Sequence, residues 1–182
     1  KADYSRKNFL NSAFTSAQRS AIKTASVVNN DNIYYGTTGG KNTSDKVFLL
    51  SDSEVYDTDI AAGYGFTKEY NIYDEARRSY CSTYAYAMGT CSAGTFYKGN
   101  IWWWLRSPGY YGYRCVAAEV NYKGWIDESG RNAFDEYDGV RPALHLNLSS
   151  TNLYSYAGTV CSDEMKSGGR QKQTNYSWDE AS

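Results

Sequence analysis

Histidine, proline and methionine are scarce in this chain of 182 residues, which contains one His, two Pro and two Met. Because His145 is the sole histidine, a Ser-His-Asp or Cys-His catalytic site would have to use it, and zinc sites built from paired histidines are excluded. Apolar and polar residues alternate around His145, which predicts a solvent-facing position on a strand. The chain also lacks a P-loop, a dinucleotide fingerprint and a G-x-S-x-G motif. We therefore expect no enzymatic activity and no cofactor.

An excess of charge of one sign is also missing. The 19 Lys and Arg residues nearly balance the 20 Asp and Glu residues, which leaves a net charge of −1. This balance argues against a broadly basic nucleic-acid surface and against a polybasic membrane patch. No run approaches the roughly 18 consecutive apolar residues that a membrane-spanning helix needs. We expect neither a nucleic-acid partner nor a membrane span.

The four cysteines form no C-x-x-C motif, which argues against zinc ribbons and thioredoxin-like sites. Cys81 and Cys91 flank a short predicted helix and could pair, so the redox compartment stays undecided. The acidic stretch from Asp127 to Asp138 fails the EF-hand template, because its glycines lie at the wrong offsets and no closing Glu follows. We interpret it as a solvated loop and expect no metal, although a less regular calcium loop stays open.

Aromatic residues, in contrast, are abundant: the chain holds 19 Tyr, 5 Trp and 6 Phe. Tyrosine-rich surfaces are typical of binding faces, because Tyr gives rigid, amphipathic contact area at a low cost in conformational entropy. The alternative is a β-rich fold that uses Tyr in half-buried strands. Composition alone does not decide between these two interpretations.

The first half of the chain has mostly helical and loop signals. Apolar spacing predicts a helical segment over 9–22, with a second helix beginning at the capping box Thr15–Gln18. A polar, glycine-rich loop follows around 29–40. We then expect a buried strand at 46–50, a short helix opened by Ser51–Glu54, and a helix over 74–88 ended by Gly89.

The second half has strand and turn signals. We predict a strand at 101–105 that is closed by a turn at 106–109. A half-buried strand at 116–120, a turn at 122–124 and a partner strand opened by Trp125 follow. The last strong strand starts at 139–144, and 155–160 could add an edge strand. The fold class is α+β: N-terminal helices, then a C-terminal antiparallel sheet with long loops. We expect one domain over 1–160 and a flexible tail over 161–182.

The segment from Tyr110 to Asp138 has the residue types of a binding face, which are aromatic anchors mixed with adaptable polar groups. The alternative is an irregular Tyr-rich loop that merely covers the sheet. The candidate ligand-binding residues are Tyr110, Tyr111, Tyr113, Arg114, Asn121, Tyr122, Trp125, Asp127, Ser129, Arg131, Asn132, Phe134, Asp135 and Tyr137.

Two motifs flank this segment: WWLRSPG at 103–109 and GVRPAL at 139–144. Together with VAAEV at 116–120, they resemble a domain family of bacterial surface and phage-borne proteins. Some members of that family are variable proteins of diversity-generating retroelements. The resemblance covers roughly residues 5–160. It implies a C-type-lectin-like fold of the formylglycine-generating-enzyme type, with 101–148 as the variable region and its flanks.

In such variable proteins, error-prone copying at adenines changes Asn codons, while the scaffold stays fixed. Most residues of the candidate face, and also Gly112, Cys115 and Asp138, are reachable from an Asn codon in this way. Others are not reachable and would belong to the scaffold or to other template codons: Glu119, Lys123, Trp125, Glu128 and Glu136. We expect Trp103 or its neighbours to anchor the core, and Arg106 and Arg141 are candidates for buried or half-buried pairings that fix the loops.

The resemblance implies a non-catalytic receptor or adhesion protein on a cell or virion surface, whose ligand is a macromolecule, more readily a protein than a glycan. The alternative is a fixed-sequence module that binds carbohydrate or cell wall, because aromatic platforms that stack on sugars would look similar. The cysteines do not match the spacing of the formylglycine enzymes, and the calcium-and-sugar motif of true C-type lectins is not visible. Neither of those activities is expected.

Overall fold

A computed structural model describes residues 8–56, 64–66, 73–90, 99–110, 115–147 and 149. These residues form short helices and small antiparallel sheets, so the α+β class is confirmed. The helical elements are α1 (Phe9–Ala13), α2 (Ser16–Ala21), α3 (Asp52–Tyr56), η2 (Glu75–Arg77) and α4 (Thr83–Ala87). The strands are β1 (Ile22–Lys23), β2 (Ala25–Val27), β3 (Thr43–Asp45), β4 (Ser79–Tyr80), β5 (Asn100–Ile101), β6 (Trp103–Pro108), β7 (Val116–Val120), β8 (Ile126–Asn132) and β9 (His145–Leu146). None of the helices described is long and apolar enough to cross a membrane.

Side chains fix the starts of the short helices. Thr15 accepts a hydrogen bond from the Gln18 N–H at 3.3 Å, and the Gln18 side chain accepts one from the Thr15 N–H at 2.9 Å, so the predicted capping box is confirmed. Ser51 and Glu54 make the same reciprocal pair at the start of α3. These local interactions satisfy backbone donors that a helix leaves open at its first turn.

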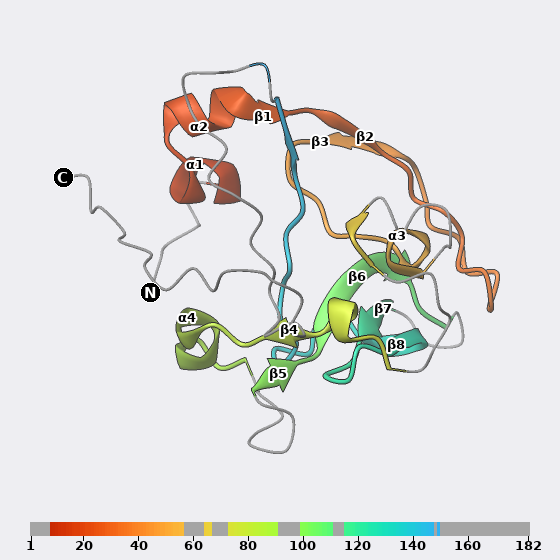
Figure 1. Ribbon diagram of the computed structural model, residues 1–182. Helices are drawn as coiled ribbons and strands as arrows, with labels where there is room; N and C mark the ends of the chain where they lie inside the picture. The colour runs from red at the N-terminus through yellow and green to blue at the C-terminus, as the bar shows by residue number, and fades with distance from the viewer. Residues whose placement is uncertain are drawn as a thin grey trace, which may run out of the picture.

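The largest sheet has the order β6-β7-β8, and all of its strands are antiparallel. The chain returns beside β6 at Gly139, which makes a single parallel bridge with Trp103. It then continues to β9, which pairs with β1 through Ile22 and Leu146. Figure 1 shows this return segment running from the three-stranded sheet up to the N-terminal helices. The end of the described chain is thereby tied to its beginning.

The hydrophobic core lies between one face of this sheet and the segments around α3 and η2. Trp103 is completely buried at its centre, and its indole N–H donates to the Arg77 carbonyl oxygen at 3.0 Å. The expectation that Trp103 anchors the core is therefore confirmed. The other buried members of this core are Leu50, Val55, Phe66, Leu105, Ala118, Val120 and Ile126.

Of the two arginines that were expected to fix loops, Arg106 makes the expected pairing, and Arg141 contacts an aromatic ring of the core. Arg106 pairs with Glu54 and donates to the carbonyl oxygens of Leu49 at 2.7 Å and Val28 at 2.9 Å. Arg141 lies over the ring of Trp103 at 4.9 Å. Arg106 thus links β6 to α3 and to the end of the β2 segment, and Arg141 caps the core with a cation–π contact.

Three predicted elements of the first 110 residues are wrong. In place of a buried strand at 46–50, β3 ends at Asp45, and Phe48 makes only a single bridge to Ala143. The helix predicted over 74–88 is divided into η2, β4 and α4, because Asp74 and Ser82 each cap a new helix and β4 pairs with β5. The turn at 106–109 is instead the end of β6, where Pro108 faces Ala117. The predicted stop at Gly89 is confirmed by its φ of 105°.

The C-terminal half also contains a correction. The predicted strand at 139–144 reduces to isolated bridges at Gly139 and Ala143, and regular pairing begins only at His145, which is exposed as predicted. The strand at 116–120 is confirmed as β7, but its last three residues are all buried, because both faces of the sheet are covered there. The predicted edge strand at 155–160 and the tail at 161–182 lie outside the described residues, as does Cys91.

Candidate ligand-binding site

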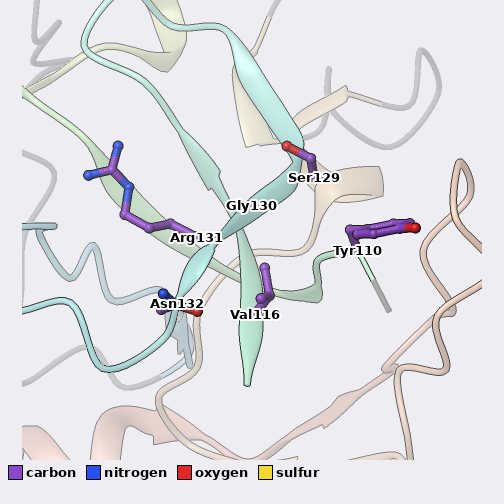
Figure 2. Close-up of a pocket in the computed structure, with 6 residues that line it drawn as sticks. All are labelled: Tyr110, Val116, Ser129, Gly130, Arg131 and Asn132. Atoms are coloured by element: carbon purple, nitrogen blue, oxygen red, sulfur yellow. The ribbon is translucent and has the colours of Figure 1, made fainter. Parts of the chain in front are cut away.

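A pocket of about 300 Å³ opens where β6 ends, β7 begins and β8 ends. In an antiparallel sheet of order β6-β7-β8 these three termini lie at the same end. Figure 2 shows the Tyr110 ring on one side of this pocket and the Val116 side chain on the other side. The lining residues are Tyr110, Val116, Ser129, Gly130, Arg131 and Asn132.

Close backbone packing brings Tyr110 to this position. The Tyr110 N–H donates to the Ser129 carbonyl oxygen at 2.9 Å, and the preceding Gly109 N–H donates to Val116 at 2.9 Å. A Cβ atom at Gly109 would collide with the Val116 side chain and with the Ser129 carbonyl oxygen. Gly109, which ends the WWLRSPG motif, is therefore needed for the close approach of the two outer strands, β6 and β8.

Asp127 shapes the bulge in β8 that forms the floor of the pocket. Ala117 pairs with Arg131, and Glu119 pairs with Asp127. The stretch between these two pairs is longer on β8 than on β7, so the extra residues of β8 form a bulge. Asp127 Oδ1 accepts the N–H groups of Ser129 and Gly130, both at 3.1 Å. The carboxylate therefore holds the bulge from inside the strand, in the manner of an Asx turn.

Replacing Asp127 by alanine is expected to lower the free energy of unfolding by about 1 to 2 kcal/mol, because the bulge loses its hydrogen-bond acceptor. Urea denaturation measures this change. Asp127→Asn is the matched control, since its amide oxygen can accept the same bonds, and it should stay within about 0.5 kcal/mol of the parent. Equal losses in both variants would show that the charge, and not the acceptor, matters.

On the other face of β8, the Arg131 side chain points away from Tyr110 (Figure 2). Its guanidinium lies 4.8 Å from the centre of the Trp102 ring, and Trp102 in turn meets Tyr122 edge to face at 5.7 Å. Lys123 Nζ lies over the Tyr122 ring at 5.7 Å. This second face is thus a row in which two aromatic side chains, Trp102 and Tyr122, lie between two cations, Arg131 and Lys123.

Two buried carboxyl groups lie beneath this row. Glu119 is 1% exposed and Asp138 is 7% exposed, and Arg131 Nε lies 3.5 Å from Glu119 Oε1 and 4.0 Å from Asp138 Oδ2. Burial raises the pKa of Glu119 to about 9, the Asp138 carboxyl adds to this shift through hydrogen bonding and charge, and Arg131 opposes it. At neutral pH Glu119 therefore carries a proton.

Residues 3–148 match a family model described as a domain of unknown function, DUF6273. The chain belongs to the DUF6273 family. No curated protein and no solved structure matches the chain. The DUF6273 match includes every residue that lines the pocket and also both buried carboxyl groups.

The DUF6273 domain divides the predicted site residues among several environments. Tyr110, Ser129 and Asn132 come together at the pocket, and Arg131 lines it too but directs its guanidinium to the other face of β8. Phe134 and Tyr137 are exposed in the segment that follows β8. Asp135 is half-buried in that segment, and its N–H donates to the Asn132 carbonyl oxygen. Tyr111, Tyr113 and Arg114 lie outside the described residues.

The hairpin turn between β7 and β8 lies at the opposite end of the sheet from the pocket, so Tyr122 and Trp125 are not part of the same cluster. Asn121 is buried in this turn, where its Oδ1 accepts the N–H groups of Lys123 at 2.8 Å and Trp125 at 3.0 Å. The predicted turn is confirmed, and Asn121 and Asp127 hold backbone in place.

Sequence reasoning missed the contribution of the polar loop around 29–40. The Tyr35 ring meets the Tyr110 ring edge to face at 5.1 Å. The contribution of this loop could have been inferred from the Ile33-Tyr34-Tyr35 run, which is apolar within an otherwise polar, glycine-rich stretch. Within the described ranges, no three His, Cys, Asp or Glu side chains gather as a metal site would require.

Proposed function

We propose that this DUF6273 domain is a non-catalytic ligand-binding protein that presents a diversified, Tyr-rich face on a fixed C-type-lectin-like scaffold. One observation carries the proposal: the pocket is lined by Tyr110, Ser129, Arg131 and Asn132, all of which are reachable from an Asn codon by adenine changes. The pocket lies at the lower end of the size range of ligand sites, which suits one anchoring side chain of a larger partner. The ligand would be a macromolecule, met at a cell or virion surface.

The distribution of burial supports this proposal. The reachable residues Asn132, Phe134 and Tyr137 are exposed, whereas Asp138 is reachable but buried and is not part of the proposed face. Variation confined to exposed positions would leave the core intact, because surface replacements usually change stability little. Asn121 is reachable yet holds a turn, so we leave it out of the proposed face.

Sequencing the coding DNA for residues 28–142 across a population of the source organism tests the proposal. We expect dense replacements at the codons of Tyr110, Ser129, Arg131 and Asn132, and none at Gly109 or in 43–56, whose silent changes serve as the internal control. Invariant pocket codons, with silent changes spread evenly along the gene, would overturn it.

A second function is favoured by one feature of the pocket, namely that an aromatic residue, Tyr110, and two polar residues, Ser129 and Asn132, line it together. Sugars bind where an aromatic ring is combined with hydrogen-bonding groups. A glycan array with the parent protein and with Tyr110→Ala tests for a fixed carbohydrate-binding module. Binding that Tyr110→Ala abolishes, together with invariant pocket codons, would establish this module in place of the diversified receptor.

A further inference from the structure

Asn32 fastens the loop around 29–40 to the strands that form the pocket. Its side chain is 1% exposed, and its amide nitrogen donates to the carbonyl oxygens of Pro108 at 2.8 Å and Glu128 at 2.9 Å. Its Oδ1 accepts the N–H groups of Tyr34 at 2.9 Å and Tyr35 at 3.0 Å. One buried and fully hydrogen-bonded amide thus ties β6 and β8 to the backbone of the loop.

This attachment places an apolar, uncharged surface next to the pocket. Ile33, Tyr34 and Tyr35 are 59%, 47% and 39% exposed, and the Tyr35 ring meets Tyr110. No charged residue occurs from Asn32 through Gly40. Exposed apolar side chains that lie together on an ordered turn mark interaction surfaces.

We propose that residues 33–35 form a fixed half of the binding face, and that the complete face docks a protein that presents an apolar loop. This inference rests on the proposed function, and it adds a partner class and residues from outside the segment 101–148. Residues 33–35 would supply constant contact area for every variant of the pocket. The pocket residues would then select among partners of this class.

The chemistry of the turn favours a protein over a glycan as the occupant. Sugars stack on aromatic rings, but an exposed aliphatic side chain such as Ile33 offers them no comparable contact. A protein loop can bury Ile33 together with the tyrosines, and one of its side chains can enter the pocket beside Tyr110. Asp31 and Lys41 flank the turn, and the Asp31 carboxylate accepts the Gly39 N–H at 2.9 Å, but residues 33–35 themselves carry no charge that an apolar partner would have to desolvate.

The test uses disulfide-cyclised peptides, selected from a random display library against the parent protein, as the probe. We expect Tyr35→Ala and Tyr110→Ala each to weaken binding of the selected peptides at least tenfold, as anchor residues do, and Ile33→Ser about threefold. Tyr35→Phe keeps the ring and should bind within about twofold of the parent. Tyr84→Ala, which removes a 58% exposed tyrosine from α4, is the matched control and should change nothing.

The outcomes separate this inference from the proposed function. If Tyr110→Ala weakens binding tenfold while Tyr35→Ala and Ile33→Ser do not, the turn is not part of the face, and the proposed function stands. If no selected peptide depends on Tyr110, both fail. If a glycan array gives ligands that depend on Tyr35 while the library gives none, the protein partner class is overturned. Thermal melting of each variant verifies that it is folded.

Discussion

Replacing Arg77 by methionine is expected to lower the free energy of unfolding by about 3 to 5 kcal/mol, which is the usual result of breaking a buried ion pair from one side. Arg77 is 1% exposed, and its guanidinium donates to the carbonyl oxygens of Gly124 at 2.9 Å and Val55 at 3.1 Å. It also lies 3.5 Å from Asp74 Oδ2. Methionine fills a similar volume, so the loss would come from these polar contacts. Guanidinium chloride denaturation of both proteins measures it.

The neighbouring arginine provides the matched control. Arg78 pairs with Glu75 at 3.2 Å, one residue along, and donates to the Lys123 carbonyl oxygen at 3.3 Å, but its side chain is 33% exposed and that of Glu75 is 56% exposed. Arg78→Met is therefore expected to cost less than about 1 kcal/mol. The double variant Asp74→Asn with Arg77→Met should recover part of the loss, because no buried carboxylate is left without its cation. A loss of equal size at Arg77 and Arg78 would contradict the role assigned to Arg77.

Pairing between distant segments explains why the helix expected over 74–88 was predicted incorrectly. The start signals at Thr15 and Ser51 depend on side chains three residues away, so the sequence alone shows them. The division of 74–88 into η2, β4 and α4 depends on the distant pairing of Tyr80 with Asn100. Apolar spacing carries no information about such long-range partners, and it continued the helix through them.

The candidate site shows the same limit. The residue types of Tyr110, Ser129 and Arg131 alone indicated a binding face. The strand order then brings these residues to one end of the sheet. Trp125 belongs to the same segment of sequence, but antiparallel strands send successive turns to opposite ends. Tyr35 joins the pocket only through the hydrogen bonds of Asn32, which no spacing rule could predict.

The buried pair of Glu119 and Asp138 leads to the last prediction, on the pH dependence of stability. The pKa of Glu119 is raised from 4.5 to about 9, so between these values the folded protein holds a proton that the unfolded chain releases. The proton bound by Glu119 contributes to the free energy of unfolding. This contribution is complete below pH 4.5 and is lost as the pH rises toward 9, by at most about 1.4 kcal/mol per pH unit. Glu119→Gln imitates the protonated group and removes this dependence.

At pH 5 the parent and Glu119→Gln are therefore expected to have similar free energies of unfolding, and at pH 8 the variant should be more stable by about 2 to 4 kcal/mol. Urea denaturation at both pH values measures the difference. Glu136→Gln, which changes an exposed carboxyl of the same acidic segment, should leave the pH profile unaltered. A Glu119→Gln variant that is less stable than the parent at pH 8 would show that Glu119 is ionised and needs Arg131.

A protonated Glu119 also bears on how position 131 could vary. Arg131 is reachable by adenine changes. If Glu119 were charged, replacing Arg131 by a neutral residue would leave a buried carboxylate without its cation. Because burial keeps Glu119 protonated at neutral pH, Glu119 does not require a cation at that position. Arg131→Ser is therefore expected to cost less than about 1 kcal/mol at pH 6, since the partly exposed guanidinium is well solvated. In the parent this cost should stay nearly constant from pH 6 to pH 8 and rise only as the pH passes about 9, where Glu119 ionises, whereas in the double variant with Glu119→Gln it should not rise there.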